Sequence, residues 1–477
     1  MESLYLLNSS TAILITFTLS FVFLVVGVIY SRKHLDINNY LVANRSIGTF
    51  SLSTSLIASA LGSWILFGPA SAATWGGIGA VVGYALGTAF PLFFLIYLGK
   101  IFRNEYPNGK TLTEVIKLKF GKKLFKLILF LSLFYMTIFL IAEVTAVSIL
   151  IKYISGTDLW ITSFIIILCA MIYTIYGGLR ASIFTDNIQF FIFSFLIIIS
   201  FYYLIFLNTE YFNLDFIKSN KPELLNFSNT NSFTSGITFF IAVSATNLFH
   251  QGNWQRIYAA KNAQVMQRSL IIAFTFIIPA IFFIGFTGLV AVSKNAQVIP
   301  DLSFFSLILE ENSLVISIVI ILLAISLTIS SIDTVLNAIS SLIIVDGNKI
   351  INTNKNFNLI AKLITISLCI ITFLIASKGL SILYLFLLAD LFCCAAAVSI
   401  FLSFFKASNN EKSIRVSIII GLIGGLLFFP STDFSKSLLI GIIMPIDFFP
   451  LIFSNYLLFW SFTVATFLPL FLLKIKI

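Results

Sequence analysis

Long apolar segments, repeated along the whole chain, limit what this sequence can fold into. About 20 apolar residues suffice for a helix to cross the hydrocarbon core of a bilayer. Only helices and closed barrels can cross it with their backbone polar groups satisfied. Of 477 residues, 59% are hydrophobic and 10% are charged, against about 25% charged residues in soluble proteins. We therefore predict an all-α polytopic membrane protein, with residues 1–477 as a single domain.

The apolar segments predict thirteen membrane-spanning helices. Their expected ranges are 12–30, 50–72, 77–98, 124–152, 160–176, 186–207, 235–250, 270–292, 313–340, 360–377, 380–404, 414–429 and 449–472.

The basic residues indicate how these helices are oriented. With the N-terminus outside, only six of the 29 Lys and Arg residues fall on the outer side, namely Lys152, Lys218, Lys221, Lys294, Lys378 and Lys436. An excess of basic residues on the inner side is typical of membrane proteins, so the distribution predicts an N-out, C-in topology. The net charge of +10 then indicates contact with anionic inner-leaflet lipid and not with nucleic acid.

A stripe of polar residues runs through the apolar segment that begins at Leu314. It consists of Ser326, Ser330, Asp333, Asn337 and Ser340. Intervals of three and four place these residues on one face of a helix. An aspartate costs roughly 2.5 to 3.5 kcal/mol at the bilayer centre, so this face should point into the bundle. The stripe is either a helix–helix packing seam or part of a cation site.

The second predicted helix contains residues that interrupt regular helical hydrogen bonding. These are Ser59, Gly62, Ser63, Gly68 and Pro69. Broken backbone at membrane depth is tolerated where it lines a cavity, and it exposes carbonyl oxygens. Alternatively, these small residues only let helices approach closely.

The seventh predicted helix, 235–250, is short and lies five helices after the interrupted one. Such a pair is typical of an inverted repeat whose broken helices form the binding site. The predicted halves are 50–207 and 235–404, with one extra helix (12–30) before them and two (414–472) after them.

Several polar residues occur in or beside the predicted spans. Glu143 and Asp390 lie within spans and point to the bundle interior, either in a transport pathway or in structural hydrogen bonds. Asp186 follows a predicted turn at Gly177-Gly178, where the helix dipole would stabilise its carboxylate.

The residues that follow Val243 are polar, and we expect them to run into the membrane interface. Trp254 and Arg256 would anchor them there, and His250 would form interfacial hydrogen bonds. The four cysteines all lie in apolar spans without CxxC spacing, so they indicate neither a disulfide framework nor a metal cluster.

Several short motifs together resemble the sodium:solute symporter family, which includes bacterial proline, pantothenate, sialic acid and sugar symporters. The matching residues are Tyr176-Gly177-Gly178-Leu179, Ala181, Thr185-Asp186, Gln189, Gln255-Arg256, Ala259-Ala260-Lys261, Gly121 and the stretch from Ser330 to Asp346. The resemblance covers roughly residues 45 to 400 and implies a LeuT-type fold with a five-plus-five inverted repeat.

The resemblance also implies a sodium site between two helices. By similarity, its ligands are the backbone carbonyls of Ala58, Leu61 and Leu327 with the hydroxyls of Ser330 and Ser331. Neutral oxygens suit a hard cation that must also be released.

Some relatives use a second sodium site, which here would involve Asp186, Asp333 and Thr334. Asp333 departs from the hydroxyl residue that is usual at its position, so it could strengthen that site or carry a proton. Ala60 replaces a polar residue of several sugar and proline carriers. The substrate residues that the resemblance implies are Ser59, Gly62, Ser63, Trp64, Asn247 and Asp390.

The resemblance therefore implies a transporter of the bacterial inner membrane that couples a small organic solute to Na⁺ as its coupling ion. The alternatives are proton-coupled symport on the same scaffold, a membrane sensor that does not transport, and an ion channel. We expect no enzymatic activity, because the sequence has no nucleophile–base pairing and no metal-ligand cluster.

Overall fold

The computed structural model describes residues 4–32, 36–207, 214–351, 357–405, 410–440 and 450–474. These residues are helical, apart from turns and two isolated β-bridges. The helices are α1 (Ser9–Ser31), α2 (Ile37–Val42), α3 (Thr49–Ala60), α4 (Gly68–Glu105), α5 (Leu112–Phe120), α6 (Lys122–Ser155), α7 (Leu159–Tyr202), α8 (Leu214–Asn220), α9 (Thr230–Phe249), α10 (Gln251–Ala259), α11 (Ala263–Lys294), α12 (Ser303–Ile308), α13 (Leu314–Ile351), α14 (Phe357–Ala376), α15 (Ile382–Phe405), α16 (Glu411–Phe428), α18 (Leu451–Ser454) and α19 (Leu457–Lys474). Short helical turns include η2 (Ser63–Leu66) and η5 (Pro300–Leu302). The predicted all-α class is confirmed.

Ten helices within the described ranges are long and apolar enough to cross a membrane, against the thirteen predicted. Four predicted spans account for the difference. The spans at 160–176 and 186–207 form one element, α7, and the span at 50–72 divides into α3, η2 and the start of α4. The span at 414–429 corresponds to α16, which is not among the ten.

A sharp bend at Gly178 divides α7 into two parts. The apolar element from Leu159 to Phe206 has 48 residues, which would extend about 72 Å as a straight helix, far more than a bilayer core of about 30 Å. Gly178 has φ 59° and ψ −159°, a conformation open almost only to glycine. The predicted turn at Gly177-Gly178 is therefore present, and the chain resumes a helix directly after it.

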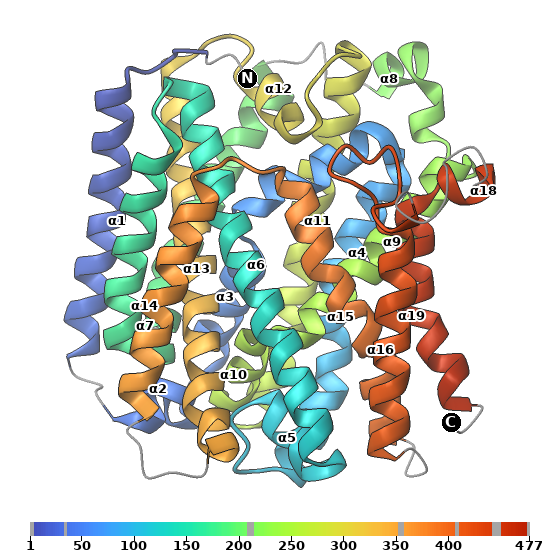
Figure 1. The fold of residues 1–477 in the computed structure, drawn as a ribbon. Helices are drawn as coiled ribbons and strands as arrows, with labels where there is room; N and C mark the ends of the chain where they lie inside the picture. The colour runs from blue at the N-terminus through green and yellow to red at the C-terminus, as the bar shows by residue number, and fades with distance from the viewer. Residues whose placement is uncertain are drawn as a thin grey trace.

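The bundle consists of two groups of helices joined by α3 and α6 (Figure 1). One group contains α1, α7, α13 and α14, and the other contains α4, α9, α11, α15, α16 and α19. α6 contacts α13 and α14 on one side and α15 on the other, while α3 contacts α7 and α13 as well as α11. The two helices that join the groups therefore lie at the centre of the molecule.

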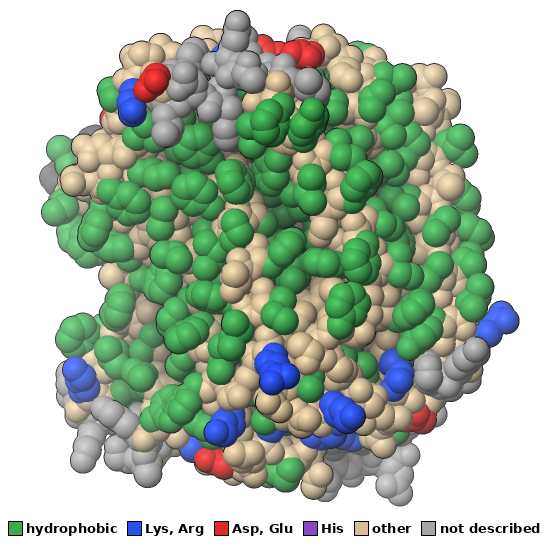
Figure 2. Space-filling view, turned by 180° about the vertical axis from the view of Figure 1, so that it is seen from behind, with side chains coloured by type: hydrophobic (Ala, Val, Ile, Leu, Met, Phe, Trp, Pro, Cys, Tyr) green, Lys and Arg blue, Asp and Glu red, His purple; other side chains and the backbone are tan. Residues whose placement is uncertain are grey.

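The surface has a hydrophobic belt with basic residues gathered at one end (Figure 2). Most of the blue side chains lie at the end where Figure 1 shows α2 and α5, and the belt above them is mostly green. This distribution is typical of an integral membrane protein.

The segment after α9 does not lie at the membrane interface. α9 ends at Phe249, the backbone breaks at His250, and α10 follows. Trp254 and Arg256 are fully buried, so the prediction that they anchor the interface is wrong. His250 is buried too, and its Nδ1 accepts a hydrogen bond of 3.1 Å from the backbone of Gly252. The short seventh helix is therefore followed by a break inside the bundle, and His250 caps the helix after it.

Candidate functional site

The helix that begins at Thr49 is broken in the middle of the bundle. α3 ends at Ala60, Leu61 leaves helical geometry (φ −103°, ψ 87°), and Gly62 is extended before η2 begins. Neither Ala58 nor Leu61 accepts a hydrogen bond from a described backbone N–H at its carbonyl oxygen. The predicted break is therefore present and leaves carbonyl oxygens free to bind a ligand.

The polar face of α13 lies against this break. Ser330 donates a hydrogen bond of 2.7 Å to Oδ1 of Asp186. The hydroxyl of Ser331 is buried and has no hydrogen-bond partner among the described residues. A Cβ atom added at Gly62 would lie 2.3 Å from this hydroxyl. Because buried hydroxyls normally have a partner, Ser331 is an oxygen available to a ligand beside the break.

Glu143 of α6 occupies the other side of the break. Its Oε2 accepts hydrogen bonds from the backbone N–H of Ser63 (3.0 Å) and from its hydroxyl (2.6 Å). Its Oε1 is buried without a partner in the described structure and would lie 2.2 Å from a Cβ at Gly62. The carboxylate thus caps η2, and it places one free oxygen on the same glycine that Ser331 approaches.

An ion pair lies one helical turn away, on the side of α10. Nη2 of Arg256 is 2.7 Å from Oδ2 of Asp186 and 2.9 Å from Oγ1 of Thr334. Ser55 of α3 donates a 2.5 Å hydrogen bond to the same Asp186 oxygen and accepts one of 2.8 Å from Nε of Arg256. All four side chains are buried. One ion pair therefore connects α3, α7, α10 and α13.

The sequence suggested that Asp186 lies at a helix end, but in the structure it does not. The second part of α7 begins just after Gly178, so Asp186 lies two turns inside it. Its charge is balanced by Arg256, which is 70 residues away in sequence.

Asp333 is surrounded by hydroxyl groups. Tyr173 donates to its Oδ2 at 2.5 Å and Ser182 to its Oδ1 at 2.9 Å. Thr185 and Thr334 donate longer bonds of 3.2 and 3.3 Å. Thr334 also accepts from Arg256, so Asp333 and Asp186 share the field of a single guanidinium.

A narrow cavity of about 30 Å³ lies between the broken helix and α9 and α15. Its lining residues are Ser59, Ala60, Trp64, Tyr84, Tyr135, Phe139, Val243, Thr246, Asn247, His250, Phe386 and Asp390. Four of the six predicted substrate residues therefore meet here. The other two, Gly62 and Ser63, contact Glu143 instead.

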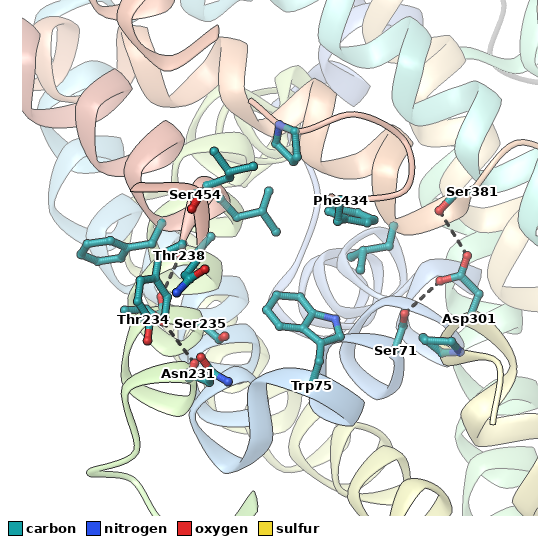
Figure 3. A pocket seen from close by; sticks show the side chains of 18 of the residues that line it. Ser71, Trp75, Asn231, Thr234, Ser235, Thr238, Asp301, Ser381, Phe434 and Ser454 are labelled. Carbon is teal, nitrogen blue, oxygen red and sulfur yellow. Dashed lines mark hydrogen bonds between the residues drawn. The ribbon is translucent and has the colours of Figure 1, made fainter. Parts of the chain in front are cut away.

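A larger cavity of about 440 Å³ opens towards the end of the molecule opposite α5 (Figure 3). Asp301 of η5 accepts hydrogen bonds from Ser71 (2.9 Å) and Ser381 (3.4 Å), which lie near the starts of α4 and α15. Burial raises the pKa of Asp301 above its usual range, and these hydrogen bonds oppose that effect. Trp75, one turn further along α4 than Ser71, also lines the opening.

The family model described as the sodium:solute symporter family matches residues 40–421. The chain belongs to this family.

Curated relatives of this symporter-family chain have different named solutes. A spermidine transporter of Candida albicans is 26% identical over 80% of this chain and 73% of its own length. Solute carrier family 5 member 4 of Rattus norvegicus is 34% identical, and sodium/glucose cotransporter 1 of Mus musculus is 30% identical. These two matches cover 32% and 34% of this chain and only 23% and 24% of those proteins.

Two solved structures share the fold of this family member. A Na⁺-coupled sialic acid symporter in a substrate-bound, outward-open state aligns with a TM-score of 0.71 at 19% identity, over 96% of this chain and 98% of the other. A nucleobase-cation-symport-1 family transporter in a closed conformation aligns with a TM-score of 0.54 at 12% identity, over 92% and 96%. Family and fold therefore identify a solute transporter with a LeuT-like architecture.

Sequence reasoning missed several residues of this transporter's sites. The cavity walls include Tyr84, Tyr135, Phe139 and Phe386, which are indistinguishable in sequence from ordinary apolar span residues. The partners of Glu143 and Asp186 were also missed, because they come from distant parts of the chain. Buried charge within the spans was the signal that could have found them.

Proposed function

We propose that this transporter couples the uptake of a small organic solute to sodium entry by alternating access. The observation that carries the proposal is the position of Ser331, whose unpartnered hydroxyl lies against the break in α3. Sodium would bind the carbonyl oxygens of Ala58, Leu61 and Leu327 and the hydroxyls of Ser330 and Ser331. Several neutral oxygens around a hard cation give binding weak enough for release.

The hydrogen bond from Ser330 to Asp186 is compatible with this role. A hydroxyl that donates its proton keeps its lone pairs for a cation. The hydroxyl hydrogen of Ser330 points to Asp186, which leaves the hydroxyl oxygen for the ion, and the nearby carboxylates add favourable long-range attraction.

Sodium in this site would join α3 to α13. Because α13 belongs to one group of helices and α3 joins that group to the other, their connection would favour one conformation over another. Coupling is then the difference in solute affinity between the two states. One sodium ion crossing 100 mV supplies about 2.3 kcal/mol, and a tenfold gradient adds about 1.4 kcal/mol.

The second cation site that we propose involves Asp186, Asp333 and Thr334. Two buried carboxylates share one guanidinium, so the group has one uncompensated negative charge when both are ionised. A second sodium ion would neutralise it. A proton on Asp333 would do the same, which is the specific observation that favours proton coupling as the second candidate function.

We infer an N-out, C-in orientation, with the basic end that holds α2 and α5 facing the cytoplasm and anionic lipid. Residues 50–207 and 235–404 would form the inverted repeats, and a bacterial inner membrane would be the location. A sensor that does not transport would bind solute without moving it.

The direct test uses the purified protein in sealed proteoliposomes. Solutes are first selected by their stabilisation of the protein against heat in sodium and in potassium, from amino acids, vitamins, urea, sugars and amines. Radiolabelled uptake is then measured under an inward sodium gradient. We expect accumulation of the solute that collapses when potassium replaces sodium. Equal uptake with and without sodium would reject sodium coupling, and binding without uptake would indicate a sensor.

A further inference from the structure

The central cavity contains one carboxylate that no basic residue balances. Asp390 is only 6% exposed. It accepts a 2.6 Å hydrogen bond from Thr246 and takes part in no ion pair within the described residues. Burying a lone carboxylate is costly unless a cation or a proton neutralises it. Since the residue faces a cavity, a cationic ligand can supply the missing charge.

The other walls of this cavity are aromatic rings in mutual contact. Trp64 is 6.0 Å from Tyr84 and 6.3 Å from Phe386, measured between ring centroids. Phe139 extends the series, at 5.3 Å from Phe386 and 6.0 Å from Tyr135. The faces of such rings attract ammonium groups, and rings gathered around a cavity are a known means of binding them. We call these five rings the aromatic cage. The aromatic cage and the Asp390 carboxylate thus favour the same kind of ligand.

An anionic group on the solute would find no Lys or Arg side chain in this cavity. None of the lining residues is Lys or Arg. The N-terminus of a half-helix at the break could bind a carboxylate, but the Ser63 N–H already donates to Glu143. These two observations argue against anionic solutes and against amino acid zwitterions.

Ring contacts connect the larger cavity to the central one. Trp75 lines that cavity and is 5.7 Å from Phe239, which is 4.4 Å from Tyr84 of the central cavity. Asp301 lines the same cavity and accepts a hydrogen bond from Ser71, one turn before Trp75 on α4 (Figure 3). The larger cavity thus also combines an acidic group with an aromatic ring.

We propose that the transported solute is an organic cation whose alkylammonium head lies in the aromatic cage beside Asp390. The inference rests on the proposed function and specifies the substrate class of its central site. A quaternary head would depend on the rings, and a primary amine would also donate hydrogen bonds to Asp390.

The test measures binding to the purified full-length protein by isothermal titration, in sodium and in potassium. The probes are choline, tetramethylammonium, putrescine and agmatine, with glucose, proline and pantothenate as neutral, zwitterionic and anionic comparisons. We expect at least one cation to bind and the comparison solutes not to bind. Failure of all four cations to bind in sodium, or stronger binding of a comparison solute, overturns the proposal.

Variants locate the site. Asp390→Asn should weaken cation binding at least tenfold, whereas the same change at the exposed Asp433 should leave it unaltered. Phe386→Leu removes a ring and no charge, so it keeps the test valid if Asp390→Asn fails to fold. Unchanged cation affinity in both cavity variants overturns the assignment.

The salt comparison separates this inference from the proposed function. Cation binding of equal strength in sodium and potassium would contradict sodium coupling and leave the substrate class standing. Sodium-dependent binding of glucose would contradict the substrate class and leave sodium coupling standing.

Discussion

Asp333 differs from the neighbouring Asp186 in the way its charge is satisfied. Asp186 has a direct contact with Arg256, while Asp333 depends on four hydroxyl groups. Hydroxyl groups stabilise a carboxylate through hydrogen bonds but leave its net charge in place. The residue therefore retains the capacity to attract one further positive charge.

Replacing Asp333 with Asn tests whether this positive charge is a sodium ion or a proton. Because the change removes the uncompensated negative charge, we expect the sodium concentration for half-maximal uptake to rise about tenfold, which corresponds to about 1.4 kcal/mol. The dependence of uptake on external pH should stay as in the unmodified protein. A pH response that is present in the unmodified protein and lost in Asp333→Asn would instead assign a proton to this carboxylate.

Some residues of the site could be predicted from the sequence and others could not. The polar face of α13 followed from intervals of three and four, and the break at Leu61-Gly62 followed from small residues in an apolar span. Arg256 was assigned to the interface because a Trp and an Arg after an apolar span are typical of that position. Its true partner, Asp186, is 70 residues away, and only tertiary packing brings them together.

At the scale of elements, the Arg256–Asp186 pair holds four helices together. Removing one partner leaves a buried unpaired charge, which costs roughly 3 to 5 kcal/mol. We therefore expect Arg256→Met to lower the melting temperature of the detergent-solubilised protein strongly. The double variant with Asp186→Asn should recover part of the loss, since it removes the stranded carboxylate. A double variant that is less stable than Arg256→Met alone would show that the pair is not the source of the effect.

The bend in α7 provides a second test at this scale. A Cβ atom at Gly178 would lie 2.7 Å from Cα of Tyr40, and the φ of +59° is unfavourable for any side chain. We expect Gly178→Ala to destabilise the protein by roughly 1 to 3 kcal/mol, measured by thermal unfolding. The matched control is Gly48→Ala, because the space around Gly48 is open; it should stay within about 0.5 kcal/mol. Equal effects of the two changes would contradict this account of the bend.

Helix counting from the sequence was accurate where each apolar run forms a separate element, as for α6, α11 and α15. It differed from the structure where glycine bends or breaks a helix, because hydropathy reports burial in lipid and carries no information on backbone continuity. The aromatic cage was not predicted for a similar reason. Phe and Tyr in a span have the same hydropathy whether they face lipid, a neighbouring helix or a cavity.

At the scale of the whole molecule, the basic end defines the proposed orientation. The native cysteines are all buried, so single cysteines introduced at exposed positions give a clean signal. In intact cells, a membrane-impermeant maleimide should label Lys436→Cys, in the turn after α16, and should label Lys412→Cys, at the start of α16, only after the cells are opened. The reverse pattern would place the basic end outside and contradict the topology.

The alternating access that we propose requires that sodium change the relation between the two groups of helices. α3 and α13 meet at the break, and the carbonyl oxygens there have no described backbone donor. A cation at this position would therefore bind groups that the protein alone leaves unsatisfied. In the proposed mechanism, the energy for solute accumulation depends on this one connection.

Sodium binding to the purified protein tests this connection most directly. Titration with sodium at constant ionic strength should give saturable binding, and Ser331→Ala should weaken it about tenfold through loss of one oxygen ligand. Ser341→Ala, ten residues further along α13, should bind sodium as the unmodified protein does, since its hydroxyl donates to the carbonyl of Ala338. The account predicts this difference between the two serines, and equal sodium affinity in Ser331→Ala and the unmodified protein would contradict it.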